Sequence, residues 1–388
     1  MKSYVVGGAV RDRLLGLPVV DRDHVVIGAT VDEMLAAGFK PVGRDFPVFL
    51  HPVTHEEYAL ARTERKVAPG YAGFVFHADP SVTLEADLER RDLTINAIAE
   101  EEDGSLVDPF DGQRDLALRL FRHVGPAFAE DPVRLLRIAR FAARFVDFGI
   151  APETLAVMRR MTDAGEVDAL VPERVWQEVA RGLMEVRPSR MVEVLRDAGA
   201  LARLFPEIDR LFRPGSDAGS RMLRALDRAA AGGATLEVRF AIFLAFGDEG
   251  GDEVDPARAI EALCARLAVP RAARDLALLV ARERAGLAAE SEPPETARVA
   301  EAMERGDAFR RRSRFLEAID AVGWTIDDDA ARARFVATLS QALEAAATVD
   351  AGAIAREAGN DPRRIGEHLR TARSAAIAAS LRKATRPG

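Results

Sequence analysis

The chain has 388 residues, of which 48% are hydrophobic and 30% charged, and its formal net charge is −8. This length allows two or more domains, and the composition is ordinary for a globular protein rather than a disordered or fibrous one. The negative total argues against a protein that coats nucleic acid through overall basicity, although it says nothing of local arginine clusters. The single cysteine, Cys264, excludes a disulfide within the chain and a cysteine-based zinc site.

The sequence shows no sign of membrane insertion or export. No apolar run approaches the roughly 20 residues that cross a bilayer. The first residues, MKSYVVGGAVRD, lack the apolar core and the small-residue cleavage site of a signal peptide. We therefore expect a cytoplasmic protein without a membrane partner.

The first 125 or so residues combine short strand-like runs with helix signals. Strands are expected at residues 4–8, 24–28, 46–52 and 56–62, and helices at residues 31–38 and 84–93. From residue 130 onward, apolar residues recur at three- and four-residue spacing, with Pro or Gly between the segments. The pattern predicts an α/β or α+β unit followed by an all-helical remainder.

The stretch GGAVRDRLLGLPVVDRD, residues 7–23, places two aspartates one residue apart. In a strand, Asp21 and Asp23 would point to the same face, where two like charges repel unless a cation lies between them. Mg²⁺ is commonly held by one or two carboxylates together with substrate phosphates. The pair therefore predicts half of a two-metal centre for phosphoryl or nucleotidyl transfer. A solvated turn is the ordinary alternative for an isolated Asp-x-Asp.

A glycine pair precedes these aspartates. Gly7 and Gly8 stand at the end of a predicted strand, just before a run with helical spacing that carries Arg11 one turn in. Bare backbone N–H groups at that point would face an anion near the carboxylates. The segment predicts a phosphate-binding turn beside the metal site.

A second informative stretch is EDPVRLLRIAR, residues 130–140. Asp131, Arg134, Arg137 and Arg140 follow one another at every third position, which lays them along one drifting face of a helix. Pro132 in the first turn and Asp131 ahead of it are good helix-start signals. An amphipathic helix with a solvated arginine face is the ordinary alternative.

Taken in order, these stretches resemble the class II branch of the DNA polymerase beta superfamily of nucleotidyltransferases. This branch holds the bacterial tRNA nucleotidyltransferases, or CCA-adding enzymes, and the bacterial poly(A) polymerases. The resemblance spans roughly the first 210 residues and is carried by residues 7–23, 90–99, 130–145 and 172–179. Residues 45–66 favour the CCA-adding enzymes.

The resemblance implies an α+β head with a small mixed sheet, followed by an all-helical neck, body and tail in an elongated molecule. The expected domains are the catalytic head at 1–128, a neck with the nucleotide-selecting helix at 129–212, a body at 213–295 and a tRNA-binding tail at 296–388. The implied activity is Mg²⁺-dependent, template-independent addition of C, C and A to tRNA 3′ ends from CTP and ATP, with release of pyrophosphate. No DNA partner is expected.

The resemblance also implies roles for individual residues. Asp21 and Asp23 would be the catalytic metal ligands. Nucleotide binding would fall to Gly8, Arg11, Arg91, Asp131, Arg134, Arg137 and Arg140, supported by Gly7, Arg90, Asp92 and Glu130. Arg91 would contact the nucleotide, while Arg90 and Asp92 shape the ribose and triphosphate pocket. Asp131 and Arg134 would read the Watson–Crick edge of the base, with Glu130 orienting Arg134.

Two further regions are expected to contact RNA or to move. Residues 66–83 have no clear period and predict an irregular loop, which by the resemblance helps the switch from C to A addition. Arg62, Arg65 and Lys66 are candidates for binding the primer end, with a solvated basic edge as the alternative. Residues 360–386 form the most basic long helical stretch and are the candidate for gripping the acceptor and T stem by shape.

The chain departs from many bacterial CCA-adding enzymes in one respect. Those enzymes carry a phosphohydrolase domain whose metal site needs a His-Asp pair and further histidines. Here no histidine lies between residues 124 and 367, and Ala245 and Phe246 stand where the pair is expected. We therefore expect phosphatase, 2′-nucleotidase and cyclic phosphodiesterase activities to be absent.

Two alternatives remain open at the level of sequence. A bacterial poly(A) polymerase, or an enzyme that adds only part of CCA, would share every catalytic residue and would be distinguished by CTP incorporation. A non-catalytic RNA-binding protein would keep the head only as structure. The presence of both carboxylates together with Arg91, Asp131 and Arg134 counts against this second alternative.

Overall fold

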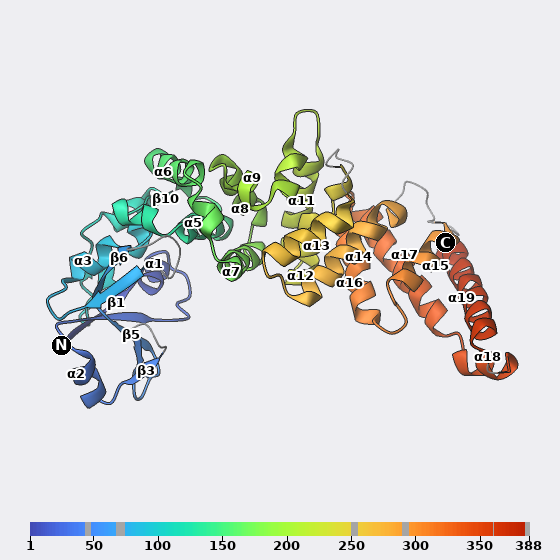
Figure 1. The fold of residues 1–388 in the computed structure, drawn as a ribbon, viewed down its shortest axis with the longest axis horizontal. Helices are drawn as coiled ribbons and strands as arrows, with labels where there is room; N and C mark the ends of the chain where they lie inside the picture. The colour runs from blue at the N-terminus through green and yellow to red at the C-terminus, as the bar shows by residue number, and fades with distance from the viewer. Residues whose placement is uncertain (43–47, 67–73, 250–254, 289–294, 360, 385–388) are drawn as a thin grey trace. The chain divides into compact units, whose positions relative to one another are not determined.

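The computed structural model describes residues 1–42, 48–66, 74–249, 255–288, 295–359 and 361–384 (Figure 1). The chain divides into two compact units. The first comprises Met1–Val175 and Glu193–Leu204, and the second comprises Trp176–Val192 and Phe205–Gly388. The four domain boundaries expected from the sequence stay a prediction.

The first unit contains a mixed β-sheet with the strand order β3-β4-β5-β2-β1-β8-β9. Its strands are β1 (Lys2–Val6), β2 (Asp23–Ile27), β3 (Lys40–Val42), β4 (Val48–Leu50), β5 (Glu57–Leu60), β8 (Ala99–Glu100) and β9 (Leu106–Val107). Strand β1 runs antiparallel to β2 and β8, whereas β2 runs parallel to β5. Because the register pairs Val6 with Asp23, the end of β1 that leads into Gly7 lies beside the start of β2.

Short helices accompany this sheet, and longer ones follow it. They are α1 (Gly8–Leu14), α2 (Val31–Ala36), α3 (Leu84–Glu89), α4 (Gly112–Ala117), α5 (Val133–Arg144), α6 (Pro152–Asp163) and α9 (Ala200–Leu204), while α7 (Pro172–Leu183) and α8 (Pro188–Asp197) cross the division between the units. Helix α2 begins with a capping box in which Thr30 and Glu33 satisfy each other's backbone N–H. The α+β head and the helical remainder expected from the sequence are confirmed.

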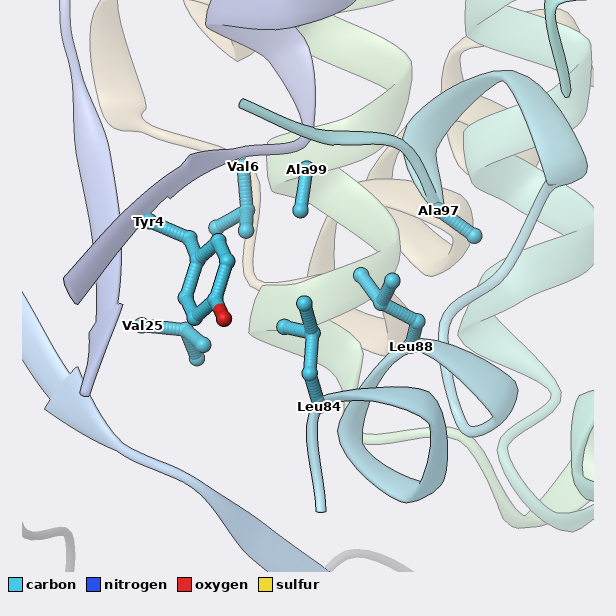
Figure 2. Close-up of a cluster of buried hydrophobic side chains, with 7 residues drawn as sticks. All are labelled: Tyr4, Val6, Val25, Leu84, Leu88, Ala97 and Ala99. Atoms are coloured by element: carbon cyan, nitrogen blue, oxygen red, sulfur yellow. The ribbon is translucent and has the colours of Figure 1, made fainter. Parts of the chain in front are cut away.

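A buried apolar cluster holds helix α3 against the sheet (Figure 2). It consists of Tyr4, Val6, Val25, Leu84, Leu88, Ala97 and Ala99. Figure 2 shows Tyr4 and Val25 on the strands and Leu84 and Leu88 on α3. Burying an aliphatic side chain of this size contributes about 1.5–3 kcal/mol. Because α3 ends at Glu89, this packing fixes the position of the three charged residues that follow it.

Two sequence-based expectations for secondary structure were wrong in part. Residues 74–78 form strand β7 (Phe74–Ala78), which pairs antiparallel with β6 (Arg62–Lys66), so the segment after residue 66 is not irregular throughout. The aromatic, β-prone composition of FVFHA is the physical reason. Residues 67–73 lie outside the described residues, and the loop's part in switching stays a prediction. The region after residue 130 also holds a short strand, β11 (Gly149–Ile150), parallel to β10 (Leu120–Phe121).

The second unit is helical where it is described, and its later helices run from green to red in Figure 1. They are α11 (Ala218–Ala231), α12 (Leu236–Leu244), α13 (Pro256–Arg266), α14 (Arg271–Leu287), α15 (Thr296–Arg305), α16 (Arg312–Trp324), α17 (Asp329–Ala347), α18 (Ala351–Glu357) and α19 (Pro362–Ala384). Cys264 is buried in α13, as expected of a core residue, and burial raises the pKa of its thiol to about 11. Among the described residues, no helix combines the length and the apolarity that crossing a membrane requires.

The position where a His-Asp pair was expected holds a packed aromatic ring. Phe246 is fully buried, and the guanidinium carbons of Arg221 and Arg284 lie 5.1 and 4.7 Å from its ring centre. Both arginines form ion pairs with Glu249, at 3.0 and 2.7 Å. The site is thus occupied by stacking and ion pairing, and the expected absence of phosphohydrolase activity stays a prediction.

Candidate active site

The first unit contains a cavity of about 700 Å³ in which the sequence motifs come together. The predicted site residues that line it are Gly7, Gly8, Arg11, Asp21, Asp23, Arg90, Arg91, Asp92, Asp131, Arg134, Arg137 and Arg140. Residues far apart in the chain therefore share one open cavity. Of the residues predicted for metal and nucleotide binding, all of which are described, Glu130 alone does not line it.

The two aspartates of the Asp-x-Asp motif are exposed at this cavity. Asp23 is the first residue of β2, whereas Asp21 precedes the strand, so the expectation that both belong to a strand was wrong for Asp21. The register explains the difference, because the neighbouring strand β1 ends at Val6, which pairs with Asp23 and leaves no partner further back.

These two carboxylates differ from the other aspartates of the cavity. Arg144 contacts Asp12 at 2.8 Å, Arg137 contacts Asp92 at 2.7 Å, and Arg174 contacts Asp131 at 2.9 Å. Asp87 pairs with Arg91 at 3.4 Å. Within the described part of the chain, neither Asp21 nor Asp23 forms an ion pair. In a space so rich in guanidinium groups, their carboxylates are the ones left available for another cation.

The donor set suits a hard divalent ion that shares its ligands with a substrate. In the described ranges, no group of three or more His, Cys, Asp or Glu side chains could hold a metal by itself. Mg²⁺ usually keeps several waters and is bound by one or two carboxylates plus substrate phosphates. Asp21 and Asp23 fit that requirement, with the arginines of the same cavity available for the phosphates.

Gly7 joins β1 to α1 in a conformation that few other residues adopt. Its φ is +73°, which is in the region that favours glycine. A Cβ atom at this position would lie 2.9 Å from Nη1 of Arg91. Its backbone N–H donates to the carbonyl of Ile98 at 3.3 Å. The glycine is therefore needed both for the turn and for the close approach of Arg91.

Arg11 lines the cavity but is almost completely buried in its wall. Its side chain pairs with Asp12 at 2.8 Å and donates from Nη1 to Oδ1 of Asn96 at 2.6 Å. Its guanidinium carbon lies 5.1 and 5.0 Å from the ring centres of Phe141 and Phe145. Burial lowers the pKa of the Arg11 guanidinium, and the charge of Asp12 opposes this effect.

Asp92 is buried, and both of its carboxylate oxygens already accept hydrogen bonds. Arg137 donates from Nε to Oδ2 at 2.7 Å, while Asn96 and the backbone N–H of Leu93 each donate to Oδ1 at 2.9 Å. Burial by itself would raise the pKa of Asp92, but Arg137 and the hydrogen bond from Asn96 outweigh it and hold the pKa well below its usual range. Asp92 is therefore an ionised anchor for Arg137.

The two arginines before Asp92 also have defined contacts. Arg91 lies 3.4 Å from Oδ2 of Asp87 and donates from Nη1 to the carbonyl of Asn96 at 3.5 Å. Arg90 donates from Nη1 to the carbonyl of Arg62 at 3.4 Å. Arg62 itself lines the cavity, and the proposed role of Arg62, Arg65 and Lys66 at the primer end stays a prediction.

The predicted base-reading pair lies where the chain enters α5. Asp131 precedes the helix, and its carboxylate accepts a hydrogen bond from the backbone N–H of Val133 at 3.1 Å. Arg174 grips the same carboxylate with both Nη atoms, at 3.3 and 2.9 Å. Such two-pronged pairs fix geometry as well as charge. Asp131 is thus presented to the cavity in one orientation.

Arg134 is buried and is oriented by backbone carbonyls. Its Nη1 donates to the carbonyls of Ala127 and Arg91, at 3.0 and 3.5 Å. No hydrogen bond among the described residues joins it to Glu130, and the orienting role of Glu130 stays a prediction. Arg140 is equally buried, 4.5 Å from the ring centre of Phe141. Two of the three arginines on this face of α5 are therefore buried, and the third, Arg137, is held by Asp92, which argues against a simply solvated arginine face.

Sequence reasoning missed several residues that hold the site together. They are Asp12, Asn96, Phe141, Arg144 and Arg174. Asn96 lies inside the motif RRDLTINA and Arg174 inside PERVWQEV, so the motifs contained them. Their partners are far away in the sequence, and a local pattern carries no signal for such pairing.

Comparison with known proteins agrees with the fold. The family model described as the poly A polymerase head domain matches residues 3–122, and the model described as the probable RNA and SrmB-binding site of polymerase A matches residues 147–212. The head, with its two available carboxylates beside an arginine-lined cavity, defines the chain as a nucleotidyltransferase.

Full-length relatives narrow this class. The multifunctional CCA protein of Cupriavidus necator is 54% identical over 98% of this chain and all of its own length. That of Burkholderia orbicola is 53% identical over 98% of this chain and 99% of its own. The chain therefore belongs to the family of the multifunctional CCA proteins, the CCA-adding tRNA nucleotidyltransferases.

Solved structures share the fold at lower sequence identity. The Bacillus stearothermophilus CCA-adding enzyme in complex with CTP is 23% identical, with a TM-score of 0.67, and the match covers 97% of this chain and 89% of that one. The Thermotoga maritima CCA-adding enzyme complexed with tRNA is 22% identical, with a TM-score of 0.65, and the match covers 99% of this chain and 90% of that one. The resemblance inferred from the motifs is confirmed.

Proposed function

We propose that this chain adds C, C and A to the 3′ end of tRNA from CTP and ATP, without a nucleic-acid template, using Asp21 and Asp23 as ligands of Mg²⁺. The observation that carries the proposal is the pair of exposed carboxylates, without an ion-pair partner in the described structure, beside a cavity lined by arginines. The full-length identity to multifunctional CCA proteins supports tRNA as the substrate. The cytoplasmic location expected from the sequence is part of the same proposal.

The residues of the cavity divide the work of nucleotidyl transfer. When bound at Asp21 and Asp23, Mg²⁺ supplies neutralisation of the triphosphate and activation of the terminal hydroxyl of the tRNA. Arg91 and Arg137 face the same cavity and would bind phosphate oxygens, because a guanidinium fork matches their geometry. Asp92 keeps Arg137 in place for this contact.

Base selection would rest on Asp131 and Arg134. A carboxylate only accepts hydrogen bonds and a guanidinium only donates them. Cytosine and adenine both present an amino donor next to a ring-nitrogen acceptor on the Watson–Crick edge, whereas uracil and guanine present a carbonyl next to a ring N–H. An acceptor from Asp131 beside a donor from Arg134 therefore favours CTP and ATP.

A poly(A) polymerase is the nearest competing function, because the matching head model carries that description. The long match to multifunctional CCA proteins favours CCA addition. A purely structural head is disfavoured, because it gives no reason for two exposed carboxylates without ion-pair partners, within the described residues, beside guanidinium groups.

The test is incorporation into a tRNA transcript that ends just before CCA, with Mg²⁺ and with CTP and ATP singly or together. We expect two C additions with CTP, one A after them, and no addition when EDTA removes the metal. Asp21→Ala and Asp23→Ala should each lower the rate on the order of 10³-fold or more, because both metal ligands act on the reacting atoms.

Asp32→Ala is the matched control, since Asp32 is an exposed aspartate of the same unit that does not line the cavity. Its rate should stay at the wild-type value. Long A tails would show that the activity is that of a poly(A) polymerase. No addition at all by the wild-type protein would refute the proposed activity.

A further inference from the structure

Asn96 connects three of the charged residues of the cavity, although none of the motifs assigns it a role. It ends a short 3₁₀ turn, Thr94–Asn96, and is 4% exposed. Its Oδ1 accepts from Nη1 of Arg11 at 2.6 Å, and its Nδ2 donates to Oδ1 of Asp92 at 2.9 Å. Its backbone carbonyl accepts from Arg91 at 3.5 Å. Both ends of the amide are therefore engaged by groups of opposite charge.

An amide is the chemical group that this position requires. It must accept a hydrogen bond from a cation at one end and donate one to a carboxylate at the other, and the two partners fix which end is oxygen. A carboxylate would lie against Asp92 as a like charge, and an apolar side chain would leave two buried charged groups without this partner. Buried networks of this kind lose more than the sum of their bonds when one member is removed.

The amide is also the central link of a longer chain of contacts. On one side, Arg11 pairs with Asp12, which binds Arg144 at 2.8 Å. On the other side, Asp92 binds Arg137 at 2.7 Å. The residues at the centre of this series of contacts are buried. At its two ends, the side chains of Arg137 and Arg144 are 36% and 32% exposed and line the cavity. The buried contacts thus set the positions of two arginines that a ligand can reach.

We propose that Asn96 is a positioning residue for the triphosphate, acting through Asp92 on Arg137 and through Arg11 and Asp12 on Arg144. The inference rests on the proposed function, since it takes the nucleoside triphosphate as the ligand of the cavity. Because phosphates are common to CTP and ATP, the role is independent of the base. Loss of the Asn96 side chain lowers the affinity for CTP and for ATP equally and leaves the selection between bases unchanged.

The experiment measures binding by calorimetric titration in the presence of Mg²⁺, with CTP, ATP and inorganic tripolyphosphate as separate ligands. We expect Asn96→Ala to weaken all three by a similar factor, about 10-fold or more, as for the loss of hydrogen bonds to charged groups. Asn96→Asp keeps the acceptor for Arg11 and sets a like charge against Asp92. This variant should therefore also weaken the binding of tripolyphosphate, because Asp92 would no longer hold Arg137 in the same position.

A double-mutant cycle separates positioning from mere stability. Asn96→Ala should cost less tripolyphosphate affinity in an Arg137→Ala background than in the wild type, because the residue it positions is already gone. Thr162→Ala is the control, since Thr162 is equally buried in the first unit and its hydroxyl donates only to the carbonyl of Met158 among the described residues. It should lower the melting temperature without changing binding.

The outcomes are distinct. Wild-type affinity for tripolyphosphate in a folded Asn96→Ala protein overturns the inference, as does full additivity with Arg137→Ala. If Asn96→Ala does not fold, Asn96→Asp decides in the same way, since unchanged tripolyphosphate affinity in that variant overturns the inference. A wild-type protein that binds CTP but not tripolyphosphate also overturns it. A wild-type protein that neither binds nor incorporates CTP refutes the proposed function instead.

Discussion

At the scale of single residues, the site is organised by which charges are paired. Asp12, Asp92 and Asp131 each hold an arginine and so orient the groups that would meet phosphate and base. Asp21 and Asp23 hold none in the described structure. Pairing of this kind stabilises a strongly charged cavity while leaving two carboxylates available for an external cation, as the proposed function requires.

Gly7 offers a direct test of how closely the turn and the arginine are fitted. Gly7→Ala would place a methyl group 2.9 Å from Nη1 of Arg91 and would also strain a backbone with φ of +73°. With φ of +73° and ψ of −129°, Gly7 lies outside the left-handed helical region, and holding another residue in such a sparsely populated conformation costs on the order of 1–3 kcal/mol. We expect a lower melting temperature and a fall in kcat/KM for CTP of about 10-fold or more, because a displacement of about 1 Å in a positioning group can cost 10²-fold.

Gly16→Ala is the matched control for this variant. Gly16 has a φ of +69°, but a methyl group there meets nothing within 4 Å. It combines a positive φ with open space, so it tests backbone strain without the contact to Arg91. A lower melting temperature with unchanged kcat/KM is expected, and equal activity losses in the two variants would contradict the assigned role of Gly7.

At the scale of secondary-structure elements, helix α5 shows how tertiary packing can reverse a sequence pattern. Its spacing of arginines is typical of a surface helix with one solvated face. In the structure, Arg134 and Arg140 are buried together with its aliphatic side chains. Phe141 lies beneath several guanidinium groups and gives them an aromatic surface on which to stack. The helix is therefore an internal wall of the cavity.

The contact of His123, just after β10, with Thr154 of α6 is expected to weaken in mild acid. The backbone N–H of His123 donates to Oγ1 of Thr154 at 3.0 Å, and its ring Nδ1 lies 2.8 Å from the same oxygen. Burial lowers the pKa of His123, and Arg122 and Arg160 act in the same direction. Below the ordinary histidine pKa of about 6.5, the unfolded chain therefore binds a proton that the folded chain does not.

The sign follows directly. Stability from this group is fully present above about pH 6.5 and is lost as the pH falls toward the lower pKa of the folded state. Urea unfolding of the wild type at about pH 7.5 and about pH 5.5, on either side of that value, should show a smaller free energy of unfolding in the acidic buffer. His123→Gln should reduce this difference, whereas His368→Gln, at an exposed position of α19, should keep it. Equal pH dependence in wild type and His123→Gln would contradict the expectation.

At the scale of the whole molecule, RNA binding depends on where the basic side chains lie. The net charge of −8 gives no general attraction for RNA, so binding must come from local basic surfaces. Helix α19 carries exposed basic side chains at Arg363, Arg370, Arg382 and Lys383. It lies within the stretch that the sequence nominated for gripping tRNA, and that role stays a prediction.

Salt dependence measures this role. Arg363→Ala and Arg382→Ala should each weaken tRNA binding, and each should reduce the slope of log K against log salt by about 1 for every phosphate that the variant no longer neutralises. The change should be the same for tRNAs of different sequence, because these arginines would bind the backbone. Filter binding between about 50 and 200 mM salt, where such slopes are steep, would show it.

Arg271→Ala is the comparison for this measurement, because Arg271 is an exposed arginine of α14 outside both the nominated stretch and the expected tRNA-binding tail. It should leave the slope unchanged. Unchanged slopes in both α19 variants would remove this helix from the RNA interface, and equal changes in all three variants would indicate a general charge effect.

The sequence by itself determined the parts of the site that depend on local chemistry. The glycine turn, the Asp-x-Asp pair, the RRD segment and the start of α5 are short motifs whose residue types suit the local backbone conformation and the proposed binding of phosphate and metal. The expected head and helical remainder follow from periodicity in the same way. What such motifs cannot contain is the pairing between them.

Only the tertiary structure decided which charges meet. Arg11 and Asn96 are 85 residues apart, Asp12 and Arg144 are 132 apart, and Asp131 and Arg174 are 43 apart. Each pair forms because the sheet, α1, α5 and the start of α7 bring residues to one cavity. Burial makes these pairings important for stability. A charged side chain left without its partner in that wall would strongly destabilise the fold.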